Sequence, residues 1–207
     1  MQTLLLQHLR SVKLAVFAAG LLPLSRAVYL GFQDKLGANP IEFVTRASGD
    51  WTLYFLCLTL AITPLRRLTS LHVLLSFRRM LGLYTFFYAC LHFLCFLWFD
   101  HFFDLEEMWR DVLKRPFITV GFVAFALLVP LAASSPGRVR RWLGRRWLQL
   151  HRLIYLIAAL AILHFGWMRS GKNNLDDPLL LGAIVGILLL SRLVFRWREH
   201  QRRSQSG

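Results

Sequence analysis

Six apolar runs, each close to the length of a membrane-spanning helix, constrain the fold of this chain more than any other feature. An α-helix needs about 20 mostly apolar residues to cross the roughly 30 Å hydrocarbon layer of a bilayer. The runs cover residues 11–30, 51–65, 80–99, 117–133, 147–168 and 178–195. Because 56% of the 207 residues are hydrophobic and only 17% are charged, against about 25% charged in soluble domains, a water-soluble globular enzyme is excluded. The sequence predicts an all-α membrane protein, a six-transmembrane-helix bundle that forms a single domain over residues 1–207.

The segments that join these runs differ in charge, and this difference predicts the orientation of the helices. The chain has 25 Lys and Arg against 11 Asp and Glu, a net charge of +14. Arginines gather at the two ends of the chain and after the second and fourth runs, for example at Arg66, Arg67, Arg140 and Arg141. Because cationic segments stay on the cytoplasmic side of a membrane, both termini are predicted to be cytoplasmic. The same placement explains the charge without a nucleic-acid partner, for which no recognition motif is present.

Three of the seven histidines lie inside the apolar runs, at His92, His151 and His164. An ionisable side chain at membrane depth indicates a functional site. A proton relay would pair histidine with intramembrane carboxylates, but all 11 acids lie in the connections or the tail. A neutral imidazole that ligates haem iron needs no carboxylate, so the histidines favour haem. The other four are expected to be solvated surface or interfacial residues: His8, His72, His101 and His200.

Depth in the membrane pairs two of these histidines. The third and fifth runs both lead outward; His92 lies eight residues before Asp100, and His164 lies five residues before Arg169. At about 1.5 Å of rise per residue, both side chains lie at nearly the same level in the outer half of the bundle. We therefore expect His92 and His164 to bind one haem from opposite sides.

His151 lies about 20 Å closer to the inner surface than the other histidine of its run. The positions at the same depth on the third helix, 13 or 14 residues before His92, are Arg79 and Arg78. A second haem at this depth therefore lacks its obvious second ligand. Three roles stay open for His151: a haem ligand with another partner such as His72, a contact to a propionate or a quinone, or packing.

Four arginines near the ends of the runs are candidate contacts for a haem propionate, a flavin phosphate or a quinone headgroup. Guanidinium groups bind such anions through paired hydrogen bonds. Arg78, Arg79 and Arg152 lie near the predicted inner surface, and Arg26 lies near the outer end of the first run. Membrane topology and lipid contact are the favoured explanation for each cation at the inner surface, and Arg26 can also extend its side chain toward the outer surface.

Taken together, these features resemble a known family. Histidines on the third and fifth helices of a six-helix bundle are typical of the ferric reductase and NADPH oxidase transmembrane superfamily. More closely, the chain is similar to the MsrQ family, the haem-carrying membrane subunits of bacterial periplasmic protein-methionine-sulfoxide reductase systems. The similarity covers nearly the whole chain and rests on His164 and on residues 20–23 (GLLP), 36–40 (LGANP), 62–65 (ITPL), 78–83 (RRMLGL), 91–92 (LH) and 143–151 (LGRRWLQLH).

The resemblance implies a ferric reductase-like transmembrane haem domain in a bacterial inner membrane. It implies b-type haem, one or two per chain, with His92, His151 and His164 as ligands, and it implies FMN. Electrons would pass from the quinone pool or a cytosolic flavin reductase to a periplasmic molybdopterin-containing subunit that reduces methionine sulfoxide in oxidised proteins. The chain would then be the electron-transfer subunit of an oxidoreductase complex rather than its catalytic subunit.

Two alternatives stay open. A stand-alone ferric or oxygen reductase would act without a periplasmic partner. A haem-free transporter or scaffold would use the histidines for packing or for substrate. Transporters tend to have interrupted helices at matching positions in two halves. Pro23, Pro64 and Pro130 lie near the ends of their runs and show no such symmetry.

Overall fold

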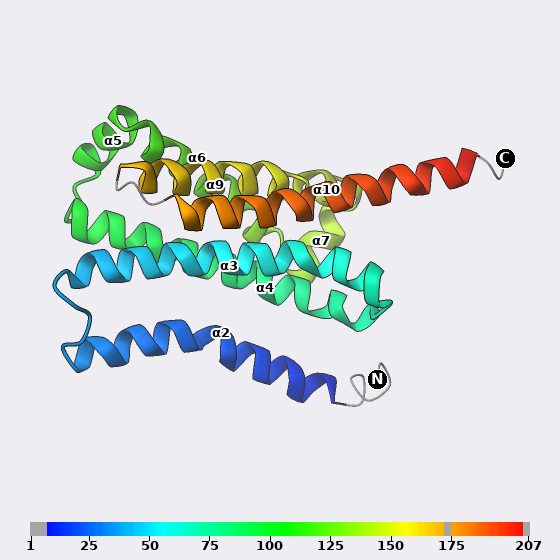
Figure 1. Cartoon of the computed structure of the whole chain (residues 1–207), viewed down its shortest axis with the longest axis horizontal. Helices are drawn as coiled ribbons and strands as arrows, with labels where there is room; N and C mark the ends of the chain where they lie inside the picture. Colours follow the sequence, from blue (N-terminus) through cyan, green and yellow to red (C-terminus); the bar gives the residue numbers. More distant parts are fainter. Residues whose placement is uncertain (1–7, 172–174, 205–207) are drawn as a thin grey trace.

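The structure, a computed structural model, describes residues 8–171 and 175–204, and every regular element in these ranges is helical (Figure 1). Six of the described helices have 18 residues or more: α2 (Leu9–Phe32), α3 (Pro40–Thr69), α4 (Leu75–Cys95), α6 (Pro116–Ala133), α9 (Leu153–Ser170) and α10 (Asp176–Ser204). Shorter helical elements join them: η1 (His72–Leu74), η2 (Phe96–Asp100), α5 (Leu105–Lys114), α7 (Gly137–Leu143) and α8 (Arg145–Leu150).

Five stretches of the described chain are long and apolar enough to cross a membrane: Leu9–Phe32, His72–Asp100, Pro116–Ala133, Arg145–Ser170 and Asp176–Phe195. Each contains one of the predicted runs, so the chain is a multi-pass membrane protein. The remaining predicted run, 51–65, lies in α3, where Asp50 and Arg66 bound a short uncharged segment. Helix α3 packs against α4 and α10, and eight of its residues are buried.

Two of the predicted runs are not single α-helices. The third continues from α4 into η2, a π-helical turn that ends at Asp100. The fifth is divided at His151 and Arg152, between α8 and α9. Because of this break, His151 does not share a continuous helix with His164.

The long helices alternate in direction, and both chain ends lie at the same end of the bundle (Figure 1). We call this the termini end and the other the opposite end. Helix α3 packs closely along α4, helix α6 packs along α9, and α10 contacts both α3 and α9. The largest described core cluster fills the space between these helices and includes Leu56, Leu60, Leu128, Ile157, Ala158 and Val185.

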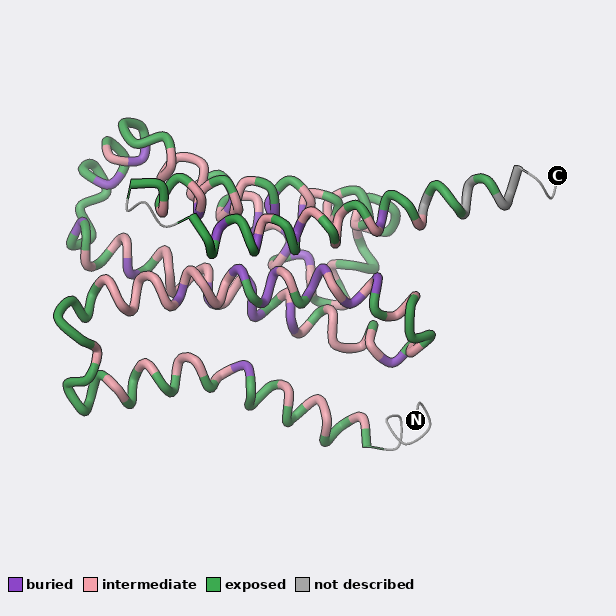
Figure 2. The backbone as a smooth tube through the Cα atoms, in the orientation of Figure 1, coloured by how far each residue is buried: buried purple, intermediate pink, exposed green. Residues whose placement is uncertain are grey.

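Helix α2 lies at the side of the bundle, and most of its residues are exposed (Figure 2). Its one buried residue among those described is Gly20, whose carbonyl accepts a 2.7 Å hydrogen bond from the Tyr88 hydroxyl. Large apolar side chains such as Leu22 (64% exposed) and Ile187 (65% exposed) point away from the protein. So much exposed apolar surface is typical of helices that face lipid.

The connection between η2 and α6 covers the opposite end of the bundle. The Asp104 side chain caps α5 by accepting hydrogen bonds from the backbone N–H groups of Glu106 and Glu107. Met108 and Val112 are buried on the inner face of α5, which packs against α6. Helix α5 thus holds its charged residues near the mouth of the cavity described next.

Candidate functional site

His92 on α4 and His164 on α9 face each other inside the bundle. Their ring centroids are 6.2 Å apart, and the ring planes meet at 72°. Both side chains line one cavity of about 980 Å³ that opens toward the opposite end. These are the two histidines that depth in the membrane pairs, and the fold brings them to the same site.

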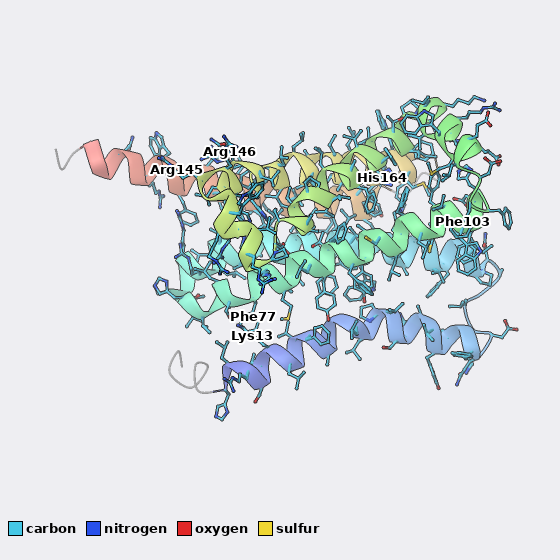
Figure 3. The ribbon with its side chains drawn as sticks, turned by 180° about the vertical axis from the view of Figure 1, so that it is seen from behind. Lys13, Phe77, Phe103, Arg145, Arg146 and His164 are labelled. Carbon is cyan, nitrogen blue, oxygen red and sulfur yellow. The ribbon has the colours of Figure 1, made fainter. Side chains whose placement is uncertain are left out.

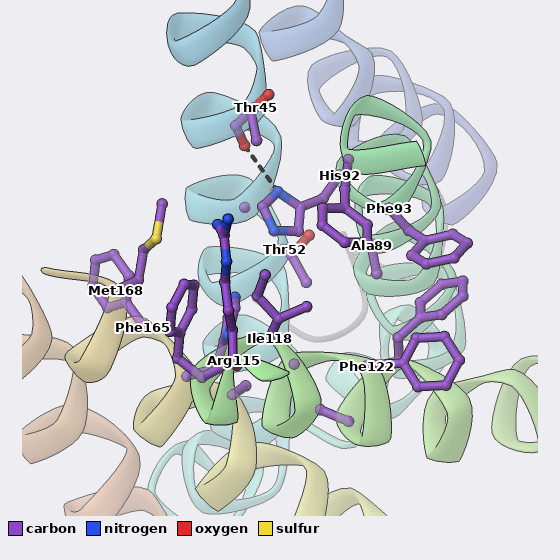
Figure 4. A pocket seen from close by; sticks show the side chains of 18 of the residues that line it. Thr45, Thr52, Ala89, His92, Phe93, Arg115, Ile118, Phe122, Phe165 and Met168 are labelled. Atoms are coloured by element: carbon purple, nitrogen blue, oxygen red, sulfur yellow. Dashed lines mark hydrogen bonds between the residues drawn. The ribbon is translucent and has the colours of Figure 1, made fainter. Parts of the chain in front are cut away.

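Each ring is held by a backbone carbonyl of a neighbouring helix. His92 Nδ1 lies 2.9 Å from the Thr45 carbonyl oxygen on α3 (Figure 4), and His164 Nδ1 lies 2.7 Å from the Phe117 carbonyl oxygen on α6. A carbonyl only accepts hydrogen bonds, so Nδ1 carries the proton in both rings and Nε2 keeps its lone pair. A carbonyl that accepts from Nδ1 fixes the orientation of the ring and leaves Nε2 in the form that can ligate a metal.

Two glycines give the rings room to reach these carbonyls. A Cβ atom on Gly121 would lie 2.7 Å from His164 Nδ1, and a Cβ atom on Gly49 would lie 3.1 Å from His92 Cε1. Any larger residue at either position would therefore push the imidazole away from its carbonyl.

Each histidine forms a half-site with the carbonyl that holds its ring and the glycine beside it, and the two half-sites are separated by a constant number of residues. The spacing is 72 residues from Thr45 to Phe117, from Gly49 to Gly121, and from His92 to His164. The residue identities of the two segments show no repeat, so the sequence does not predict one. The equal spacing from Gly49 to Gly121 and from His92 to His164 is the signal in the sequence that could have revealed the repeated half-site.

The cavity has an apolar interior and a charged mouth. Aromatic and aliphatic side chains line the part around the histidines, including Leu53, Ala89, Phe93, Phe122, Phe125 and Phe165 (Figure 4). Four lining arginines pair with acids near the mouth. Arg115 Nε lies 2.8 Å from Asp111, Arg46 Nη2 lies 2.5 Å from Glu42, Arg169 Nη2 lies 3.6 Å from Asp177, and Arg110 pairs with Glu106. A flat apolar group with anionic substituents at one edge would place its apolar part in the interior of the cavity and its anionic edge beside the arginines at the mouth.

The residues present fit a haem better than a metal ion held by protein alone. In the described part of the chain, no group of three or more His, Cys, Asp or Glu side chains is placed to hold a metal. His92 and His164 would hold the iron of a haem, and the porphyrin would supply its other ligands. The ring centroids of the two histidines are 6.2 Å apart, so both imidazoles reach the same part of the cavity.

His151 belongs to a different environment. It lies where α8 ends and does not line the cavity. Its ring contacts that of Trp147, with 4.0 Å between centroids and the planes tilted by 33°, and its Nε2 lies 3.1 Å from the Ser134 hydroxyl. His72, considered as its partner, is exposed on η1.

The four candidate arginines also lie away from the large cavity. Arg26, Arg79 and Arg152 are exposed, and Arg78 is half-buried beside a second, smaller cavity at the termini end. The arginines that do line the large cavity, Arg46, Arg110, Arg115 and Arg169, were not singled out from the sequence. In the sequence these arginines lie in or beside polar connections that are far apart. Only the folded structure brings the four side chains together at the mouth of the cavity.

His101 corrects one expectation. It was predicted to be a solvated loop residue, but it is only 5% exposed and lines the large cavity. Its ring meets Phe96 edge-on at 4.6 Å, and its Nε2 lies 3.6 Å from an Asp111 carboxylate oxygen. The π-helical turn η2 and helix α5, which packs beside it, bury the His101 side chain. The sequence predicts neither feature.

Comparison with known proteins relates the chain to one family of membrane proteins. A family model described as the ferric reductase like transmembrane component matches residues 48–162. The chain is similar to proteins named protein-methionine-sulfoxide reductase heme-binding subunit MsrQ from three bacteria. It is 58% identical to that of Herminiimonas arsenicoxydans over 94% of this chain and 90% of the relative. For Ralstonia nicotianae the values are 50%, 97% and 93%, and for Bordetella pertussis 54%, 91% and 91%. No solved structure matches the chain.

Proposed function

The chain belongs to the MsrQ family of protein-methionine-sulfoxide reductase haem-binding subunits, and from this premise we propose that it conducts electrons across a membrane through a haem bound by His92 and His164. The observation that carries the proposal is the pair of imidazoles 6.2 Å apart in an apolar cavity, each with Nδ1 bonded to a backbone carbonyl. The haem of the proposal is b-type, held by two histidines and no covalent link.

The residues that line the cavity have different proposed roles in binding haem. A bound haem supplies reversible one-electron chemistry at its iron. His92 and His164 would present Nε2 to that iron, while the Thr45 and Phe117 carbonyls fix both rings. The phenylalanines around them exclude water. The arginines at the mouth, which pair with acids, would hold the propionates through their remaining N–H groups, because a guanidinium has five donors and matches a carboxylate through two hydrogen bonds.

The proposed direction of transfer rests on the charge of the two ends. The termini end carries arginines and lysines such as Arg145, Arg146 and Lys13, whereas His164 lies toward the opposite end (Figure 3). If all six long helices cross the membrane, with α3 as the sixth span, cationic connections place the termini end in the cytoplasm. The large cavity then opens toward the periplasm of a bacterial inner membrane.

The donor and the acceptor complete the proposal. We propose the quinone pool or a cytosolic flavin reductase as the electron donor at the termini end, with FMN as a further cofactor by family resemblance. We propose a periplasmic molybdopterin-containing subunit as the acceptor that reduces protein methionine sulfoxide. His151 stays outside this haem site, because its ring is held by Trp147 and Ser134.

The test uses the full chain in proteoliposomes with the acceptor outside. The haem band should appear in the purified protein, become reduced by quinol or by reduced flavin, and become oxidised when acceptor and methionine sulfoxide are added. His164→Ala should abolish this cycle, while His8→Ala, an exposed histidine, should leave it intact. Oxidation by ferric citrate or oxygen without the acceptor would instead favour a stand-alone reductase. A protein without a haem band would favour the haem-free transporter or scaffold.

A further inference from the structure

A second cavity lies at the termini end, where four long helices meet. It has a volume of about 180 Å³ and is lined by Thr63 and Arg67 of α3, Arg78 of α4, Tyr155 of α9, and Arg192 and Phe195 of α10. Half of these six described lining side chains are arginines, and none is a carboxylate. The composition of this wall points to an anionic ligand.

Arg192 is built into the wall and is only 7% exposed. Its Nη1 donates a 3.1 Å hydrogen bond to the Tyr155 hydroxyl, and its Nη2 donates a 2.6 Å hydrogen bond to the Leu60 carbonyl. Its Nε is buried without a hydrogen-bond partner in the described structure. A buried guanidinium without a counter-charge is costly, so the remaining donor and the positive charge call for an anion.

Two further groups face the same cavity. Thr63 Oγ1 is buried and has no hydrogen-bond partner among the described residues. Arg78 makes no ion pair in the described part of the chain, and its charge lies on the same wall as that of Arg192. The wall thus offers two guanidinium groups and a hydroxyl, the donor set that binds the oxygens of a phosphate.

We propose that this cavity binds a phosphate group, either from a phospholipid headgroup or from a soluble phosphate ester. The volume admits the phosphate and leaves the rest of such a molecule outside the wall. The site goes beyond the proposed electron transfer and does not depend on haem, since it shares no lining residue with the large cavity.

The test measures phosphate binding by the purified full-length protein in two arms. Native mass spectrometry with phosphatidic acid, against phosphatidylcholine as the reference lipid, probes a lipid source. A shift of the melting temperature with inorganic phosphate, against chloride at equal ionic strength, probes a soluble source. Preferential binding in the first arm assigns a lipid headgroup, and binding in the second assigns a soluble phosphate.

The variants separate a built site from general surface charge. Arg78→Gln should weaken binding about tenfold or more, the loss of a charge-assisted contact. Arg79→Gln removes the same charge from the next, exposed residue and should change binding less than about twofold. Arg192→Gln should match Arg78→Gln, and where it fails to fold, Arg78→Gln decides. Equal losses in Arg78→Gln and Arg79→Gln, or no binding in either arm, would overturn the proposal. The haem band of each variant reports separately on the electron-transfer site.

Discussion

The two helix pairs α3–α4 and α6–α9 build the same half-site but differ toward the termini end. In each pair, a histidine of the second helix bonds a carbonyl of the first, and a glycine four residues after that carbonyl makes room. The same 72-residue spacing relates His151 to Arg79. Arg79 is exposed, whereas the His151 ring contacts that of Trp147. The repeat is therefore complete around one pair of imidazoles and broken at the other level.

This difference teaches that three histidines predicted at membrane depth lie in two different environments. What distinguishes His92 and His164 is an anchored Nδ1, a glycine beneath the ring and a partner ring across an apolar cavity. His151 has a hydrogen bond to a hydroxyl and no opposing imidazole in the described structure. The comparison predicts that the three histidines respond differently to substitution.

The largest effect is expected from removing either half of the pair. His92→Ala and His164→Ala should each lower haem content about tenfold or more, because one axial ligand is lost. The measurement is haem per chain from absorbance and protein concentration, with His8→Ala as the exposed-histidine control. A haem content that stays at the wild-type level in either variant would contradict the shared site.

The glycines should give the next largest effect, and an unequal one. Gly121→Ala places a methyl group 2.7 Å from His164 Nδ1, whereas Gly49→Ala places one 3.1 Å from His92 Cε1. We expect Gly121→Ala to lower haem content several-fold and to cost about 1–3 kcal/mol of stability, with a smaller loss for Gly49→Ala.

Gly166→Ala is the matched control for these two variants. It lies on α9 with nothing within 4 Å of the added methyl group. Because alanine favours a helix over glycine by about 1 kcal/mol, this variant should be neutral or slightly more stable. Thermal unfolding and haem content of the three variants decide the order. Equal melting temperatures and haem contents of Gly121→Ala and Gly166→Ala would contradict the proposed role of Gly121.

His151→Ala should have a smaller effect on haem. It removes the ring contact with Trp147 and the contact with Ser134, so stability should fall by about 1–2 kcal/mol while haem content stays near wild type. Haem content that falls by half would show instead that His151 binds a second haem. Haem per chain and the melting temperature, measured on one preparation, separate the two outcomes.

The smallest effect is expected from Ser134→Ala. It removes the hydroxyl 3.1 Å from His151 Nε2 but leaves the ring contact with Trp147 in place, so the cost should be about 1 kcal/mol or less. Thermal unfolding of this variant beside His151→Ala measures how much of the His151 environment depends on the hydrogen bond. A larger loss than in His151→Ala would mean that the Ser134 hydroxyl acts elsewhere, for example through the hydrogen bond it donates to the Leu131 carbonyl.

The sequence predicted the parts of this fold that follow from hydropathy and rise per residue. Five of its apolar runs lie in helices able to span a membrane, and counting residues from the helix ends brought His92 and His164 to one level. Both properties depend on local geometry, which a helix imposes regardless of its neighbours.

The sequence did not predict features that depend on contacts between distant segments. The carbonyls of Thr45 and Phe117 are identified only once α3 lies beside α4 and α6 beside α9. The burial of His101 needs a π-helical turn, which apolar periodicity does not reveal. Likewise, Arg192 reads as a tail cation until α10 packs against α3 and α9.

Electron paramagnetic resonance of the oxidised full-length protein tests the shared haem most directly. The account predicts a low-spin ferric signal typical of two imidazole ligands, lost in His92→Ala and in His164→Ala and retained in His151→Ala. A low-spin signal that survives in either of the first two variants, or disappears in the third, would contradict a haem held between His92 and His164.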